Sequence, residues 1–231
     1  MKISRKKISL WFLDLAINIA IIFVLVIIIQ KWIIAPFDVH GQSMCDTMNF
    51  IDGKCKNGIG EKIIINEAVY IFNDPERGDI VVFNTENSED KYYIKRVIGL
   101  PGETVEIIDR KIYVTTTKGE KIELNEAYLN LTNKDNTNSG YNSSSVFEIP
   151  EGKYLMLGDN RMNSTDSRTC FSGNTQNAED CKNNPEKAFI DRENIRGKAW
   201  VVWWPLSNLR HIDRFEYITE NQENSESLEE K

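Results

Sequence analysis

Histidine is nearly absent from the chain, which has only 2 among its 231 residues. His40 lies three residues before Ser43, the candidate nucleophile, and His211 follows the last predicted strand, so neither suits a serine–histidine–aspartate triad. No Cys-x-x-Cys spacing occurs, which disfavours a zinc site. Acidic residues outnumber basic ones and the net charge is -7. We therefore predict no metal, no cofactor and no nucleic-acid partner.

Helix-forming patterns are scarce beyond residue 34. Short apolar or alternating runs between turn residues instead predict β-strands, at residues 62–65, 68–72, 79–83, 92–100, 103–107, 111–114, 153–157 and 198–205. Asn, Ser, Thr and Gly dominate residues 130–145, which predicts a surface loop. The length and an apolar content of 41% are enough for one compact, mainly β domain with a smaller lobe.

The N-terminal region carries the one strong helical signal. Residues 10–29 are apolar apart from Asp14 and Asn18, close to the roughly 20 residues that cross a bilayer. We predict a cytoplasmic basic segment at 1–7 and a transmembrane anchor at 8–34, which would place the rest outside the cytoplasm. A cleaved signal peptide is the alternative, although no small-x-small cleavage pair ends the run. The acidic residues 216–231 predict a disordered tail.

The four cysteines form two local pairs. Cys45 is close in sequence to Cys55, and Cys170 to Cys181, so each pair encloses a short loop. Two disulfides in an oxidising compartment are the preferred interpretation, with a four-cysteine zinc site as the rival.

Ser43, in the segment Gly-Gln-Ser-Met, needs a base if it is a nucleophile. Because no histidine is suitable, a lysine could take this role, provided that burial lowers its pKa by several units and leaves the amine neutral. Lys95 lies inside a predicted strand between Ile94 and Arg96, so its side chain points to the face opposite both neighbours. Ser43 and Lys95 are therefore the candidate catalytic pair.

Four motifs follow the predicted anchor in order, at residues 41–47, 77–83, 93–103 and 158–168. In this order they resemble bacterial type I signal peptidases, which are membrane-anchored Ser/Lys endopeptidases. The resemblance covers residues 1–205 without the insertions. It implies a mostly antiparallel β catalytic domain at 35–215 with a variable lobe at about 115–152. It also implies removal of signal peptides from exported preproteins, after an Ala-x-Ala-like site, at the outer face of the cell membrane.

The resemblance assigns roles residue by residue. Ser43 would be the nucleophile, Lys95 the general base, and Ser164 a hydrogen-bonding partner of Lys95. Two supporting ion pairs would join Asp159 to Arg96 and Asp166 to Arg168. Small apolar pockets for the substrate would be lined by Phe37, Val39, Met44, Val82, Tyr93 and Ile94. The implied partners are preprotein signal peptides and membrane lipid, with the protein translocation machinery as a further candidate.

The chain departs from the family pattern around the nucleophile. Gly41 stands where some members have a serine that binds the oxyanion, so the Gly41 backbone N–H is the substitute we expect beside that of Ser43. Cys45 and Asp46 occur where many members have a proline before Thr47, and a Cys45–Cys55 disulfide would restrain the same loop. Insertions at 49–60 and at about 169–187 exceed the usual spacing.

Two alternatives stay open at this point. One is a specialised or self-cleaving Ser/Lys protease, which would carry its own scissile segment. The other is a membrane-anchored β domain that binds a ligand without catalysis, for which Ser43, Lys95 and Ser164 would be dispensable.

Overall fold

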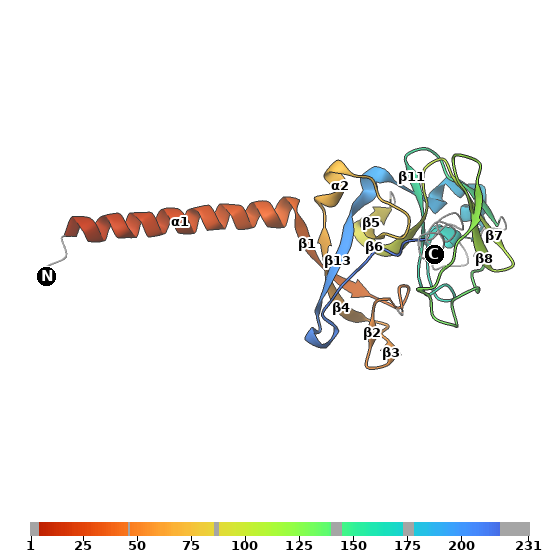
Figure 1. Cartoon of the computed structure of the whole chain (residues 1–231), viewed down its shortest axis with the longest axis horizontal. Coiled ribbons are helices and arrows are strands. Elements are labelled where there is room, and N and C mark those ends of the chain that lie inside the picture. Colours follow the sequence, from red (N-terminus) through yellow and green to blue (C-terminus); the bar gives the residue numbers. More distant parts are fainter. Residues whose placement is uncertain (1–4, 46, 86–87, 140–144, 173–177, 218–231) are drawn as a thin grey trace, which may run out of the picture.

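The computed structural model describes residues 5–45, 47–85, 88–139, 145–172 and 178–217. A long helix, α1 (Arg5–Trp32), extends from a domain built mainly of β-strands (Figure 1). The other helical segments are short: α2 (Val69–Phe72), α3 (Ala178–Asn183), and the 3-10 turns Ser167–Thr169, Pro185–Ala188, Arg192–Asn194 and Leu206–Asn208. The mainly antiparallel β fold predicted from the sequence is confirmed.

The main sheet has 8 antiparallel strands in the order β1-β4-β13-β5-β6-β11-β12, with β14 paired to β13. Their bounds are β1 Ile34–His40, β4 Ile59–Asn66, β5 Ile80–Thr85, β6 Ser88–Gly99, β11 Lys153–Leu157, β12 Phe189–Asp191, β13 Ile195–Trp204 and β14 Arg210–His211. On β6, residues 92–95 pair with β5 only, because β11 begins its pairing at Arg96. Within the described chain, residues 92–95 therefore have no neighbouring strand on the side away from β5, and β1 has none on its outer edge.

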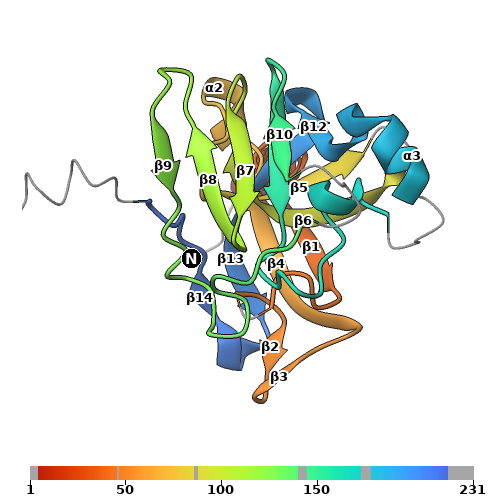
Figure 2. The ribbon, with the colours of Figure 1, turned by 90° about the vertical axis from the view of Figure 1, so that its right-hand side faces the viewer.

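A second antiparallel sheet of 4 strands forms the smaller lobe, in the order β10-β7-β8-β9. These strands are β7 Thr104–Ile108, β8 Lys111–Thr115, β9 Lys121–Glu123 and β10 Val146–Glu148. The predicted hairpin turn at Asp109 and Arg110 is present, and both residues have positive φ. Figure 2 shows this sheet beside the main one, with the small hairpin β2 (Phe50–Ile51) and β3 (Lys54–Cys55) extending from the opposite end.

The run 68–72 was predicted as a strand, and this prediction is wrong. Residues Val69–Phe72 form α2, whose first N–H is accepted by the side chain of Asn66. Tyr70 points inward and donates a hydrogen bond to Asp79 at 2.8 Å, while Phe72 is exposed. A run of five apolar residues does not distinguish a strand from a helical turn by its pattern alone.

The core beside β1 positions the start of the candidate site. Side chains from β1, β4, β5 and β13 pack together here, among them Val39, Ile63, Val82 and Val202. Met44, the residue after Ser43, is only 1% exposed and belongs to the same cluster. The chain on both sides of Ser43 is therefore anchored by apolar packing.

The predicted anchor at 8–34 corresponds largely to α1, but it is not supported as a membrane span. Among the described residues, no helix combines the length and the apolar character needed to cross a bilayer. The apolar side chains of α1 between Trp11 and Ile27 are exposed. Residues 1–4 of the predicted cytoplasmic segment lie outside the described residues.

One residue of the predicted disordered tail, Tyr217, packs against the domain. Tyr217 lies within the predicted disordered segment 216–231, yet its hydroxyl is 3.0 Å from that of Tyr128. Phe215 packs against the rings of both tyrosines. The remainder of the predicted tail, 218–231, lies outside the described residues.

Both predicted disulfides are formed, Cys45 with Cys55 and Cys170 with Cys181. No thiolate of these cysteines is left for the rival zinc site. The first disulfide joins the loop after Ser43 to β3, within the insertion 49–60. The second lies in the insertion 169–187, of which residues 173–177 are outside the described chain. Each closes a loop of about ten residues, and such a crosslink stabilises a fold by roughly 2–3 kcal/mol.

Candidate active site

Ser43 lies in a tight turn directly after β1. Gly41 has φ +79°, a left-handed conformation that a glycine adopts without strain, and it starts the turn. The carbonyl of Ser43 accepts a hydrogen bond from the backbone N–H of Asn160 at 3.0 Å. Gly158 permits this close approach, because a Cβ there would overlap the Ser43 carbonyl. The first and the last motif are thus joined through backbone atoms.

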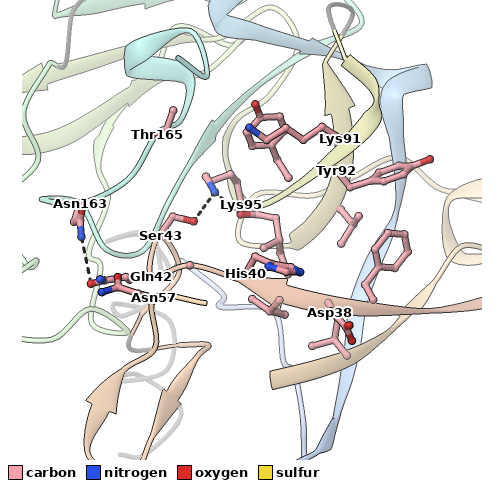
Figure 3. Close-up of a pocket in the computed structure, with 17 residues that line it drawn as sticks. Asp38, His40, Gln42, Ser43, Asn57, Lys91, Tyr92, Lys95, Asn163 and Thr165 are labelled. Atoms are coloured by element: carbon pink, nitrogen blue, oxygen red, sulfur yellow. Dashed lines mark hydrogen bonds between the residues drawn. The ribbon is translucent and has the colours of Figure 1, made fainter. Parts of the chain in front are cut away.

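Lys95 reaches Ser43 from the neighbouring part of the main sheet. It lies on β6 opposite Val81 of β5, and its side chain is only 3% exposed. Its Nζ donates hydrogen bonds to Ser43 Oγ at 2.7 Å and to the Ile94 carbonyl at 2.7 Å (Figure 3). The sequence-predicted pair is therefore brought into direct contact, although the two residues are 52 positions apart.

Burial lowers the pKa of Lys95 to about 8, from an ordinary value of 10.5. The nearby carboxylates of Asp166 and Asp159 act in the opposite direction, but they do not overcome the cost of placing a charged amine where water is excluded. A substantial fraction of Lys95 is therefore neutral near pH 8.

Both ion pairs expected from the sequence are formed and buried. Arg96 holds Asp159 through two hydrogen bonds, Nε to Oδ1 at 2.9 Å and Nη2 to Oδ2 at 2.6 Å. Arg168 holds Asp166 in the same way at 2.9 and 2.7 Å. Burial raises the pKa of Asp166, but Arg168 outweighs it, so that this pKa falls below its usual value. Both arginines thus offset negative charge close to the Lys95 amine.

The expected hydrogen bond between Ser164 and Lys95 is absent. Ser164 Oγ is buried and makes no hydrogen bond to Lys95 among the described residues; its hydroxyl is one of the groups that lower the pKa of Asp166. It lies instead against Gly158, where an added Cβ would overlap it. The Lys95 amine is directed by Ser43 and by the Ile94 carbonyl. Residue order alone indicated that Ser164 is near the site, but not which way its hydroxyl points.

The expectation for Gly41 as an oxyanion donor is also corrected. Its backbone N–H donates to the carbonyl of Gly58 at 3.1 Å and is therefore occupied. The backbone N–H of Ser43 makes no hydrogen bond within the described residues, so it remains available to a ligand. Gly41 contributes the left-handed turn and the link to Gly58.

A cavity of about 410 Å³ opens beside Ser43 and Lys95, between the end of β1 and β6 (Figure 3). Five of the six predicted substrate residues line it: Phe37, Val39, Val82, Tyr93 and Ile94. Met44 does not, because it is buried in the core beneath the turn. Polar residues that the sequence did not single out also line the cavity, among them Gln42, Asn57, Lys91, Asn163 and Thr165.

Comparison with known proteins identifies the family. The family model described as signal peptidase, peptidase S26, matches residues 12–204. The chain belongs to this family. A signal peptidase I from Bacillus amyloliquefaciens is 37% identical over 211 residues, covering 90% of this chain and 92% of the relative. A signal peptidase IB from Staphylococcus aureus strain COL is 32% identical over 220 residues, covering 90% of this chain and 95% of the relative.

Among solved structures, a signal peptidase I from Enterococcus faecalis V583 is 29% identical and covers 55% of this chain and 97% of its own. The TM-score is 0.38, which is too low for a comparison of folds. The family and the curated relatives confirm the resemblance drawn from the motifs. The protein is a serine endopeptidase of the signal peptidase I type.

Sequence reasoning missed a third buried ion pair behind the site. Arg161 is fully buried and binds both carboxylate oxygens of Glu126, which lies just after β9. The ring of Tyr128 lies 4.0 Å from the Arg96 guanidinium. Arg161 lies in the last motif, but the position of its partner 35 residues upstream had no signal in the sequence.

We expect Lys95→Met to stabilise the protein at pH 7 while removing the candidate base. The variant lacks the penalty of a buried amine, so its free energy of unfolding should rise by on the order of 1–3 kcal/mol. In the wild type, the buried charged amine lowers the free energy of unfolding by its full amount below about pH 8, the pKa of Lys95 in the folded state. This destabilisation disappears as the pH rises past 10.5, the pKa of the lysine in the unfolded chain. The gain measured by denaturant unfolding should therefore shrink between pH 7 and pH 10.

Lys118→Met is the control, because Lys118 is exposed in a turn outside the cavity. It should change the unfolding free energy little at either pH. A Lys95→Met protein that is less stable than wild type at pH 7 would contradict the assignment of a strained, desolvated amine.

Proposed function

We propose that the protein removes N-terminal signal peptides from exported preproteins, with Ser43 and Lys95 as its catalytic dyad. The observation that carries the proposal is the 2.7 Å contact between Lys95 Nζ and Ser43 Oγ at the wall of a cavity. Family membership supports the substrate class, and the lowered pKa of Lys95 supports the role of base. A binding domain without catalysis would need neither feature.

Acylation begins when the neutral Lys95 amine accepts the proton of the Ser43 hydroxyl. Oγ attacks the scissile carbonyl and forms a tetrahedral intermediate. Its oxyanion is stabilised by the Ser43 backbone N–H, for which the described residues provide no acceptor. The protonated Lys95 then gives its proton to the leaving amine of the mature protein, and the signal peptide stays bound to Ser43 as an ester.

Deacylation uses the same lysine. Once the amine of the mature protein has left, a water molecule occupies its place and Lys95 accepts a proton from it. The resulting hydroxide attacks the ester carbonyl, and the proton returns from Lys95 to Ser43 Oγ. Lys95 is thereby returned to its neutral form at the end of each cycle.

The substrate can bind as an extended strand between β1 and β6. Both border the cavity. The outer edge of β1, and the side of β6 residues 92–95 that faces away from β5, have no strand partner in the described chain. Backbone groups of a peptide could pair with such edges, while alternate side chains point into apolar pockets. Phe37, Val39, Val82, Tyr93 and Ile94 give the cavity an apolar wall, and membership of the family favours Ala at the first and third positions before the cut.

Attachment to the membrane through α1 completes the proposal. The exposed side chains between Trp11 and Ile27 are almost all apolar, and Figure 1 shows α1 extending away from the domain. Exposed apolar surface of this extent favours contact with lipid. The basic residues before it favour a cytoplasmic N-terminus, with the β domain on the outer face and near exported substrates.

Cleavage of a preprotein with an Ala-x-Ala site tests the dyad. Ser43→Ala and Lys95→Ala should each lower kcat by at least about 10³-fold, because the nucleophile and its base act as a unit. Lys118→Ala is the control, because Lys118 is exposed and does not line the cavity, and it should retain cleavage. Circular dichroism checks that the variants fold. Unimpaired cleavage by either dyad variant would exclude the mechanism.

The pH dependence of kcat/KM tests the role of Lys95 independently. Only the neutral amine can accept the Ser43 proton, so kcat/KM should rise with pH through an apparent pKa of about 8. Well below this value it should fall about tenfold per pH unit. The measurement needs a substrate without groups that titrate in this range. A flat profile from pH 5 to pH 9 is incompatible with a lysine base.

Fractionation tests the attachment through α1. The full chain should remain with membranes after an alkaline carbonate wash, whereas a chain starting at residue 34 should be released. The shortened chain should still cleave a short Ala-x-Ala peptide, which checks that its β domain is folded. Protease added to intact spheroplasts should digest the domain of the full chain. Recovery of the full chain in the soluble fraction would contradict membrane attachment.

A further inference from the structure

The side chain of Asn49 is fully buried beneath the segment that carries Ser43. Its Nδ2 donates to the carbonyls of Val39 at 3.0 Å and Gly41 at 2.7 Å. Its Oδ1 accepts the backbone N–H of Glu61 at 2.7 Å. The carboxamide therefore uses both donors and its acceptor, and both donors hold the chain directly before the nucleophile.

The backbone of Asn49 is adapted to this position. Its φ of +61° is left-handed, a conformation in which asparagine is among the most favourable residues after glycine. Gly60 lies against the carboxamide, and a Cβ on Gly60 would overlap Asn49 Oδ1. The insertion 49–60 thus begins and ends with residues that allow the carboxamide to reach β1.

Behind Asn49, Glu61 forms the centre of a buried charged cluster. Its carboxylate accepts hydrogen bonds from the Asn49 backbone at 2.9 Å and from Arg210 at 2.6 and 2.9 Å. Burial raises the pKa of Glu61, but the hydrogen bonds from Arg210, Asn208 and Asn49 outweigh burial and lower it. Arg210 also donates to the Thr47 carbonyl at 2.7 Å. The cluster therefore holds the turn on both sides of Ser43.

The other side of the turn is held by the last motif. Asn160 binds the carbonyls of Gln42 and Ser43, and the Thr47 hydroxyl donates to Asp159 at 2.5 Å. Those contacts come from a motif that the sequence identifies. The contacts of Asn49 come from an insertion that lies outside all four motifs, and they act on the opposite side of the same turn.

We infer that Asn49 is a positioning residue for Ser43, which keeps the nucleophile within hydrogen-bonding distance of Lys95. The inference rests on the proposed function. Asn49 touches neither substrate nor reacting atoms, and it acts through the carbonyls of Val39 and Gly41. Loss of its two donors lets the turn relax away from Lys95, and a displacement of about 1 Å at a reacting group costs up to about 10²-fold in rate.

Two substitutions test this role. Asn49→Asp keeps the size and the acceptor but replaces the amide donors with an oxygen that faces two carbonyls. Asn49→Gly keeps the left-handed backbone and removes the side chain. The control is Asn208→Ala, because Asn208 donates to the same Glu61 carboxylate and to the Phe50 carbonyl, but makes no hydrogen bond to β1 or Gly41 among the described residues. It weakens the cluster without releasing Val39 or Gly41.

The readout is the steady-state kinetics of the full-length variants in detergent, with an Ala-x-Ala peptide as substrate. The temperature is kept well below each melting transition. Both Asn49 variants should lower kcat by about 10-fold to 100-fold, with a smaller change in KM. Asn208→Ala should stay within about twofold of wild type in kcat even if its melting temperature falls. A residue that only stabilises the domain should not affect kcat when the variant is fully folded.

Three results would overturn the inference: an unchanged kcat in both Asn49 variants, an equal loss of kcat in Asn208→Ala, or failure of both Asn49 variants to fold. The proposed function is judged separately, by whether the wild type cleaves the same peptide and Ser43→Ala does not. A negative result for Asn49 therefore leaves the dyad assignment intact.

Discussion

The buried amine of Lys95 is the constraint on which the site depends. A lysine acts as a base at moderate pH only if it loses its proton easily, and burial beside Ser43 provides this. Two carboxylates lie close enough to favour the charged form. Each is held by two hydrogen bonds from an arginine, Asp159 by Arg96 and Asp166 by Arg168. The arginines reduce the negative potential at the amine and so help to keep it neutral.

Buried ion pairs of this kind are poor evidence of stability, because desolvation of both charges offsets much of their attraction. Here the ion pairs fix the positions of the segments that they join. Arg161 joins the last motif to Glu126 beyond the second sheet, and Tyr128 of the same region covers Arg96. Removing one partner would leave a buried charge unpaired, which is far more costly than replacing both. The smaller lobe therefore shapes the catalytic region although none of its strands lines the cavity.

Much of the architecture was predictable because β-strands are short and local in sequence. Apolar or alternating runs bounded by Gly, Pro and Asn located half of the described strands, and the hairpin at Asp109 was predicted from its turn residues. The shorter strands and β1, which leads to Ser43, had no such pattern. Residues 69–72 were misassigned because the apolar run was interpreted without Asn66, whose side chain accepts the Val69 N–H, and without the inward contact of Tyr70 with Asp79. The Asn66 contact is a local helix-start signal, whereas the contact with Asp79 is not visible in a pattern of five residues.

For the site, motif order located the residues but not the directions of their polar groups. Ser43 and Lys95 meet as expected, whereas the hydroxyl of Ser164 and the N–H of Gly41 do not have the expected roles. Arg210 is 149 residues from Glu61, and no spacing rule connects them. The direction of a hydrogen bond depends on how distant segments pack in the folded protein. No local sequence pattern predicts that packing.

The turn that carries Ser43 is short, and most of its hydrogen bonds go to other segments. Its carbonyls bind Asn160 and Asn49, its side chain binds Lys95, and a disulfide ties Cys45 to β3. A turn held in this way adopts the geometry imposed by its neighbours rather than one preferred by its own sequence. This explains how the chain can differ from the family pattern at Gly41 and Cys45 while Ser43 stays beside Lys95. The insertion 49–60, which supplies two of these restraints, is then part of the active-site scaffold rather than a passive loop.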